Sequence, residues 1–378
     1  PLQGTHPSAK LAARSRHVCA FLGAGASRAC GLPDIATLQK QVLQRLDDGD
    51  RVALERQLTG RNLEQVLSRL RRIAALLSGD QRIDGLTAED AVALDATVCR
   101  AIVAELDLGS ADLAPMLDFA AWAARAGYHL PLELFTVNYD LLIETALERL
   151  RAAYFDGFVG ALQARFHTEL VEAATGSGED AVPAFFTRLW KLHGSVNWAW
   201  TAERHIVRLG QPVPEGHAAA IYPSDTKYEE SRRVPFVVLQ DRFRRALHQP
   251  ETLLLIAGYS FADEHLNELI FDAAARRERS EFVAFCYSEI PDQLAARALR
   301  TPNLQVVTGT EAILGGVRAD WSVPADPAPG VWEGGRLALR DFRHFAKYLA
   351  RSSTREADDD MRAGVGARTV GSGGVGGG

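Results

Sequence analysis

The chain has 378 residues, of which 47% are hydrophobic and 24% charged, and its formal net charge at pH 7 is −6. This length suits one large domain or two ordinary ones, and the composition predicts a sizeable buried core. The acidic balance argues against a protein that coats nucleic acid, which needs a surplus of Lys and Arg to neutralise phosphates.

Four cysteines occur, at positions 19, 30, 99 and 286, and no two form a C-x-x-C pair. We therefore expect free thiols in a reducing compartment and no zinc site of the paired-cysteine kind. No apolar run reaches the ~20 residues of a membrane helix, and the first ten residues lack the apolar core of a signal peptide. These features predict a cytoplasmic protein with no metal and no membrane segment.

Short apolar runs predict core strands at residues 17–22, 132–137, 187–192, 252–259, 281–287 and 304–307. The run at 252–259 is apolar almost throughout, as expected of a parallel strand that is buried on both faces. Strands alternate with helical segments, and polar residues recur where the strands end. This pattern predicts an α/β fold, a Rossmann-like doubly wound parallel sheet with a large helical insertion.

The helical insertion is expected at residues 36–127, between the first and second strands. In its clearest helix, Asn62 and Gln65 resemble a capping box, and one apolar face carries Leu63, Val66, Leu67, Leu70, Ile73 and Leu77. A second helix should begin near Pro115. We divide the chain into an N-terminal arm (1–16), a main domain (17–320), a C-terminal helical appendage (321–353) and a disordered glycine-rich tail (354–378).

A glycine-rich turn follows the first strand and consists of Gly23, Ala24, Gly25, Ala26 and Ser27. Glycine lets a backbone approach a phosphate without a Cβ clash, and a helix N-terminus offers free N–H groups to an anion. The turn is therefore a candidate phosphate site. The alternative is a tight strand-to-helix turn without a ligand.

Polar residues also follow three later strands: Asn138 and Asp140, then His193, then Gly258 and Ser260. In an open parallel sheet, ligands bind outside the carboxyl ends of the strands. These residues and the glycine turn should therefore meet along one edge, and the sequence predicts a single ligand pocket there.

Two of these residues suit a reacting centre. Asn138 both donates and accepts hydrogen bonds, so it could hold a ligand hydroxyl or an attacking water. His193 can act as a base near neutral pH. The alternatives are a helix-capping role for Asn138, a purely structural His193, and an Asp140 that interacts with the dipole of the next helix.

Further residues near these motifs have predicted supporting roles. Asp34 is expected to brace the glycine turn, while Ser260 and Asp263 are interpreted first as helix caps, with Ser260 preferred as a ligand contact. Asn267 is a weaker candidate for a ligand contact. Three tryptophans are expected in the core or at the pocket rim: Trp190, Trp198 and Trp200.

Taken together, these motifs resemble the sirtuins. The segment 23–34 is similar to their first signature, GAG followed by a serine and then G-[IL]-P-D, and TVNYD (136–140), KLHGS (191–195) and GYSFAD (258–263) are similar to three later ones. The resemblance implies that 17–320 is an NAD-binding domain with Asn138 and His193 as catalytic residues. The implied cofactor-binding residues are Gly23, Ala24, Gly25, Ser27, Asp34, Asp140, Gly258 and Ser260.

The amino-acid sequences of the later motifs are more similar to those of the bacterial sirtuin-like NAD-cleaving effectors (NADases) of anti-phage defence than to those of deacetylases. The four-cysteine zinc ribbon of deacetylases is missing, and Ile35 and Ala36 replace their Phe-Arg pair. The resemblance therefore implies an NAD⁺ nucleosidase that uses NAD⁺ as its substrate, with water as nucleophile and an oxocarbenium-like transition state. The alternatives are an NAD-dependent protein deacylase and a non-catalytic module that senses NAD⁺ or ADP-ribose.

An activity that depletes NAD⁺ must be restrained, so the resemblance also implies that a homo-oligomer or a partner controls this activity. The helical insertion (36–127) is the surface we expect to be used. A separate regulator such as a HerA-type ATPase or an Argonaute-like protein is expected on family analogy. No direct nucleic-acid binding is expected.

Overall fold

The computed structural model of the chain describes residues 16–125, 128, 130–173, 182–183, 185–201, 203, 205–214, 219–221 and 234–352. The expected N-terminal arm, apart from residue 16, and the expected tail lie outside the described residues. Within these ranges, no helix combines the length and apolar character that a membrane crossing requires.

A nine-stranded sheet forms the centre of the molecule. Its order is β14 (Val317–Asp320), β13 (Glu311–Leu314), β12 (Leu304–Val307), β11 (Glu281–Phe285), β10 (Thr252–Ala257), β1 (His17–Leu22), β2 (Glu133–Thr136), β6 (Thr187–Lys191) and β3 (Tyr154–Phe155). Strands β12 to β3 are parallel, and β13 and β14 add an antiparallel edge. The predicted Rossmann-like fold is confirmed, and every predicted core strand is present.

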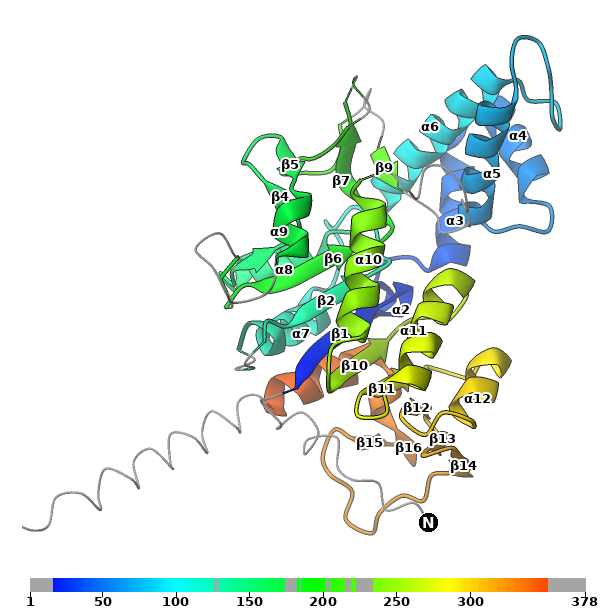
Figure 1. The fold of residues 1–378 in the computed structure, drawn as a ribbon. Coiled ribbons are helices and arrows are strands. Elements are labelled where there is room, and N and C mark those ends of the chain that lie inside the picture. The colour runs from blue at the N-terminus through cyan, green and yellow to red at the C-terminus, as the bar shows by residue number, and fades with distance from the viewer. Residues whose placement is uncertain are drawn as a thin grey trace, which may run out of the picture.

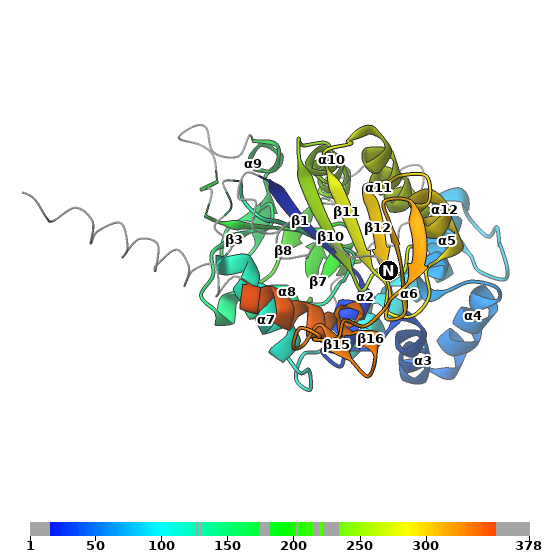
Figure 2. The same ribbon diagram turned by 90° about the horizontal axis from the view of Figure 1, so that it is seen from below.

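The central strand β1 explains why helices cover both faces of this sheet. All six of its residues are buried. Because side chains alternate along a strand, Val18 and Ala20 pack into one core cluster and Cys19 and Phe21 into the other. Figure 2 shows α10 (Phe236–Leu247), α11 (Glu264–Arg276) and α12 (Asp292–Ala298) on one face, and α7 (Ala114–Arg125), α8 (Leu142–Arg149) and a helix over 342–352 on the other.

The segment between β1 and β2 is helical. After α2 (Ala24–Ala29) come α3 (Ile35–Arg45), α4 (Asp48–Leu58), α5 (Leu63–Leu76) and α6 (Ala88–Glu105), and then α7. The predicted capping box of Asn62 and Gln65 is confirmed with both of its hydrogen bonds, and Thr87 and Asp90 form a second one at α6. Figure 1 shows α3 to α6 as a block beyond the carboxyl end of β1.

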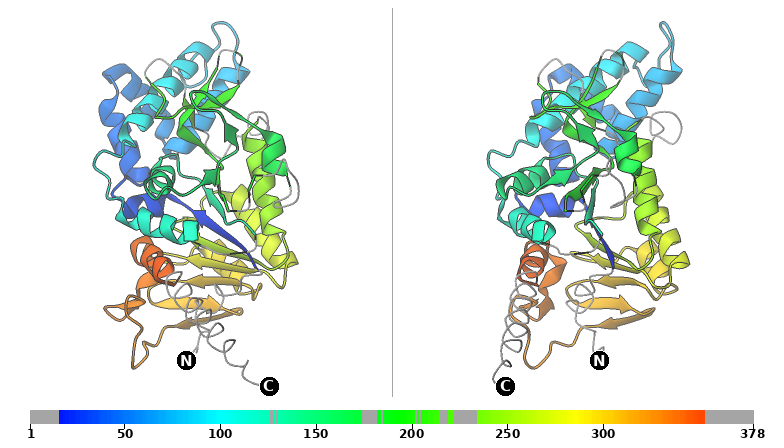
Figure 3. Two further views of the ribbon diagram at one scale, coloured as in Figure 1. Left: turned by 90° about the vertical axis from the view of Figure 1, so that its left-hand side faces the viewer. Right: turned by 60° about the vertical axis from the view of Figure 1, so that its left-hand side comes forward.

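A second, five-stranded sheet was not predicted. It is antiparallel, in the order β4 (Phe158–Val159), β5 (Ala164–Phe166), β8 (Ile206–Arg208), β7 (Gly194–Trp200) and β9 (Ala219–Ile221), and α9 (Thr168–Glu172) follows β5 in the chain. Most of these strands have only two or three residues, too few for a clear alternation of apolar and polar positions. Figure 3 shows this sheet at the same end of the molecule as the helical block.

The C-terminal appendage is helical only in its second half. The segment first forms a hairpin of β15 (Trp332–Glu333) and β16 (Arg336–Leu337), then η1 (Ala338–Arg340) and the helix over 342–352. Gly334 and Gly335, with φ of 55° and 78°, make the hairpin turn, which favours positive φ at both of its central residues. This glycine pair is the physical reason why the helix does not begin earlier.

The strand order creates a topological switch beside β1. The chain leaves β1 to form β2 on one side and later returns to form β10 on the other. In such sheets the loops after the two strands diverge and leave a crevice at their carboxyl ends, which is where ligands bind. The fold therefore places the glycine turn after β1 and the Gly258 loop after β10 at this crevice.

Candidate functional site

The loops after β1 and β10 interlock at the switch point. The amide of Gly25 donates to the carbonyl of Gly258 at 2.8 Å. A Cβ on Gly23 would lie 2.6 Å from the Gly258 oxygen, and one on Gly258, whose φ is +66°, would lie 2.4 Å from the amide nitrogen of Ala26. These glycines are thus required by backbone packing between two motifs, and their contact with a phosphate stays a prediction.

Asn138 is held by the glycine turn. Its side-chain amide donates to the carbonyl of Gly23 at 3.0 Å and to Oγ of Ser27 at 2.8 Å. Since both N–H donors are used, the acceptor Oδ1 is what this side chain can offer to a ligand. The alternative role of Asn138 as a helix cap is wrong, because the N-cap of α8 is Leu141 and the side-chain amide of Asn138 donates to Gly23 and Ser27 instead.

Asp140 extends the same chain of hydrogen bonds. Ser27 Oγ donates to Oδ2 of Asp140 at 2.5 Å, while Oδ1 accepts from the amide of Leu142 at the start of α8. Asp140 therefore serves the helix start and the site together. The buried Lys191 amine donates to the carbonyls of Tyr139 and Asp140 and pairs with Glu144 at 2.9 Å, so β6 and α8 fix the loop that carries Asn138.

His193 lies two residues after the end of β6 and pairs with Asp263. Its Nε2 is 3.2 Å from Oδ2 of Asp263, and both side chains are almost fully buried. The second ring nitrogen, Nδ1, is buried and has no hydrogen-bond partner. Asp263 also caps α11, since its Oδ1 accepts from the amides of His265 and Leu266. The cap predicted for Asp263 is confirmed, whereas Ser260 caps no helix.

The helical block reaches this loop through Tyr139. The hydroxyl of Tyr139 donates to Oε1 of Glu64, on α5, at 2.8 Å. Burial and this carboxylate both raise the pKa of Tyr139 well above its ordinary value, so the phenol stays neutral. Asp34 caps α3 through the amide of Thr37 and lies 3.7 Å from the guanidinium of Arg28 on α2.

These side chains surround one cavity of about 710 Å³. A volume of this size is in the usual range for small-molecule and cofactor sites. The predicted site residues that line it are Ala24, Gly25, Ser27, Asp34, Asn138, Asp140, His193, Gly258 and Ser260. Gly23 does not line the cavity, and the weaker candidate Asn267 is buried outside it, where it accepts from Tyr259 and donates to Phe261.

The cavity wall also contains residues that the motifs did not indicate. Glu64 comes from the helical block, and Arg28, Arg340 and Arg343 add positive charge. Arg343 donates to Asp112 and to the carbonyl of Ala29, which ties the C-terminal segment to α2. Arg340 and Arg343 belong to no recognisable motif, so no local signal in the sequence could have found them.

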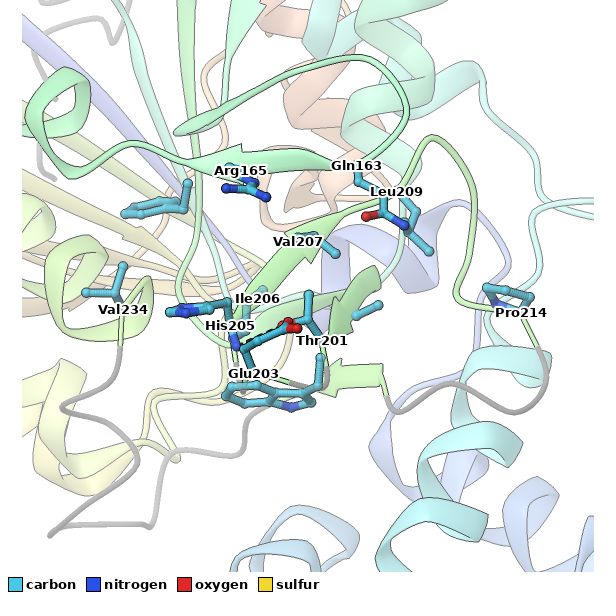
Figure 4. Close-up of a pocket in the computed structure, with 13 residues that line it drawn as sticks. Gln163, Arg165, Thr201, Glu203, His205, Ile206, Val207, Leu209, Pro214 and Val234 are labelled. Atoms are coloured by element: carbon cyan, nitrogen blue, oxygen red, sulfur yellow. Dashed lines mark hydrogen bonds between the residues drawn. The ribbon is translucent and has the colours of Figure 1, made fainter.

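A larger cavity, of about 940 Å³, lies on the small sheet (Figure 4). Its lining includes Arg165, Trp200 and His205, and it shares no residue with the cavity at the switch point. We assign the candidate site to the smaller cavity because all four motifs meet there. Of the three tryptophans, Trp190 and Trp198 lie in the core and Trp200 lines this second cavity.

One buried group of potential metal ligands occurs among the described residues: His17, Cys19 and Glu133. The Glu133 carboxylate is already bound by Arg242, at 2.6 and 2.7 Å, by Trp190 at 2.7 Å and by His17 at 2.9 Å. A carboxylate saturated by a guanidinium, an indole and an imidazole has no free lone pair for a cation. This group is a buried ion cluster between the sheet and α10.

A doubly wound sheet with a cavity at its switch point, lined in part by charged side chains, has the architecture of the nucleotide-binding α/β proteins. Residues 132–307 match the family model described as "SIR2-like domain". This segment contains three of the four motifs, those around Asn138, His193 and Gly258. The chain therefore carries a SIR2-like domain, which confirms the resemblance to the sirtuin-like family and indicates an NAD-utilising protein. No curated protein matches the chain.

Proposed function

We propose that this protein hydrolyses NAD⁺ to nicotinamide and ADP-ribose, as an NAD⁺ nucleosidase. The observation that carries the proposal is the convergence of Asn138 and His193 on one cavity with the two glycine loops. A dinucleotide fits a cavity of about 710 Å³ at the carboxyl ends of the strands of a doubly wound sheet, and charged side chains line this cavity.

The charges around the cavity suit the two ends of NAD⁺. Acidic side chains, among them Glu64, Asp140 and Asp263, favour the cationic nicotinamide ring. Arginines at positions 28, 340 and 343 can interact with the pyrophosphate. The acceptor Oδ1 of Asn138 can orient a ribose hydroxyl or the attacking water, because the amide N–H groups are already bound to Gly23 and Ser27.

His193 is the base in this proposal. Nicotinamide leaves as a neutral ring because it takes the electron pair of the broken glycosidic bond, so the leaving group needs no acid. The attacking water must lose a proton, and a neutral imidazole accepts it. His193 lines the cavity, and its buried Nδ1 has no hydrogen-bond partner, which supports this role because an unpaired polar atom needs a partner to complete its hydrogen bonding.

The test is nicotinamide release from NAD⁺, measured by chromatography for the wild type, Asn138→Ala and His193→Ala. Each variant should lose at least about 100-fold in rate, the usual contribution of a positioned base or orienting group. His205→Ala is the matched control, because His205 is exposed and lines the other cavity. The proposal fails if His193→Ala keeps the wild-type rate.

The same assay separates the other candidate functions. Adding an acetylated peptide would yield O-acetyl-ADP-ribose if the protein were a deacylase. A non-catalytic sensing module would instead be stabilised by NAD⁺ or ADP-ribose, with no nicotinamide released. Each result would replace hydrolysis as the function of the site.

We further propose that NAD⁺ depletion by this protein serves anti-phage defence, and that an oligomer or a regulatory partner on the helical block restrains it. The support is the resemblance of the motifs to bacterial NAD-cleaving effectors, together with the contact between the block and the Asn138 loop through Tyr139 and Glu64. Phage challenge of cells carrying the wild type or Asn138→Ala tests this role. Equal protection by both would contradict it.

A further inference from the structure

His193 and Asp263 form a buried pair built from two distant parts of the chain. His193 follows β6, and Asp263 precedes α11, 70 residues later. Their side chains are only 6% and 10% exposed, and Nε2 lies 3.2 Å from Oδ2. Since β7 to β10 and α10 separate them in sequence, only the folded protein brings them together.

Asp263 is ionised in this setting. Burial alone would raise its pKa, but the hydrogen bond with His193 and the amides of Leu266 and His265 hold the pKa below its ordinary value. An ionised carboxylate accepts hydrogen bonds and cannot donate them. When the imidazole is neutral, its single proton must therefore be on Nε2, and Nδ1 is left as a bare acceptor.

The environment of Nδ1 agrees with this tautomer. The atom is buried, and no described residue donates to it or accepts from it. The imidazole lines the cavity that also contains Asn138. A bare ring nitrogen beside a substrate cavity is a base, and the carboxylate on the other nitrogen orients it, as in the histidine–aspartate pairs of other hydrolytic sites.

We propose that Asp263 is a positioning residue that keeps Nδ1 of His193 unprotonated, so that Nδ1 is the atom that accepts the proton during NAD⁺ hydrolysis. This inference rests on the proposed function. The bond from the ribose C1′ to the nicotinamide nitrogen breaks and its electron pair neutralises the ring. Water forms the new C1′–O bond, its proton passes to Nδ1, and the imidazolium bound to Asp263 then releases the proton to solvent.

Asp263→Asn tests the proposal without removing the helix cap. Asn and Asp are equally good N-caps, and the cap amides of His265 and Leu266 require an oxygen facing them. The NH₂ of the variant amide must then face Nε2 of His193. An NH₂ donates, so Nε2 becomes the acceptor, and the ring proton moves to Nδ1.

Blocking Nδ1 should lower kcat for nicotinamide release by about 100- to 10,000-fold, with KM changed only a few-fold. The melting temperature should stay close to that of the wild type. Asp47→Asn is the matched control, because Asp47 caps α4 in the same way and is exposed and outside the cavity. A merely structural role for Asp263 predicts wild-type kcat in a folded variant, and that result would overturn the proposal.

Nitrogen-15 NMR of labelled histidine tests the tautomer independently of activity, with the His193 signals assigned from His193→Gln. The expected result is an unprotonated Nδ1 in the wild type and an unprotonated Nε2 in Asp263→Asn. Identical ring shifts in the two proteins would refute the positioning role. If the wild type releases no nicotinamide but the tautomer reverses as expected, the proposed hydrolysis fails while the pairing stands.

Discussion

At the scale of single residues, the ion cluster between the sheet and α10 shows how burial and charge compete. Burial alone would lower the pKa of His17, but Cys19 and Glu133 raise it to about 10. For Glu133, burial would raise the pKa, yet Arg242 and His17 lower it to about 2. Both side chains are therefore charged in the folded protein at neutral pH.

This cluster predicts a pH dependence of stability. His17 titrates near 6.5 when unfolded and near 10 when folded, so its contribution is complete below pH 6.5 and is lost as the pH rises to about 10. The difference in unfolding free energy between the wild type and His17→Gln should shrink by a few kcal/mol across this window. Urea unfolding at several pH values measures it, and a constant difference would contradict the prediction.

The charges of the cluster could not be predicted from sequence. His17 and Glu133 were read only as members of apolar strands, and their partner Arg242 lies in a helix far along the chain. The same holds for the pair of His193 and Asp263. A sequence motif identifies such residues only when they lie close together in the sequence, as Asn138 and Asp140 do.

At the scale of elements, α5 is coupled to the loop after β2. The hydroxyl of Tyr139 and the carboxylate of Glu64 form the contact, which is partly buried. Because the loop also carries Asn138, this hydrogen bond is one physical route by which the helical block can influence the site. It joins the part of the chain outside the SIR2-like match to a motif inside it.

A double-mutant cycle with Tyr139→Phe and Glu64→Gln should measure a coupling free energy of about 0.5–1.5 kcal/mol, the net contribution of a hydrogen bond in a folded protein. Urea unfolding of the four proteins gives the value. Tyr154→Phe is the control, since its hydroxyl donates to Glu148 at an exposed position and its loss should cost less. Additive effects of the two substitutions would show that the contact carries no coupling.

The helices and strands also show which parts of the fold can be predicted from the sequence. Parallel strands buried on both faces appear as continuous apolar runs, which is why β1 and β10 were found. The helix α5 was found from its capping box and its apolar face. Strands of two or three residues, such as β4 and β5, carry too few positions for any periodicity, and tertiary packing decides their form.

At the scale of the whole molecule, the C-terminal segment belongs to the core although it lies outside the SIR2-like match. Phe342, Phe345 and Leu349 are buried in the same cluster as Val18 and Leu22 of β1. The ring of Phe345 lies 4.6 Å from that of Phe285, which lines the candidate site. The helix over 342–352 therefore forms part of the cavity wall and packs against Phe285.

This packing predicts that the C-terminal helix unfolds together with the sheet. Phe345→Ala should lower the unfolding free energy by about 3–5 kcal/mol, the cost of emptying a buried phenylalanine site, and unfolding should remain a single transition. Calorimetry and urea unfolding followed by fluorescence test both points. Phe185→Ala is the matched control: Phe185 is 78% exposed, so its loss should cost much less.

The same substitution should weaken the stabilisation of the protein by ADP-ribose. Arg340 and Arg343 line the cavity from the C-terminal segment, and Phe345 holds that segment against the sheet. A ligand that binds only the folded protein raises the melting temperature according to its affinity, so a displaced wall reduces the shift. If instead Phe345→Ala produced a separate early transition with an unchanged ADP-ribose shift, the segment would be an appendage that docks on the domain without shaping its site.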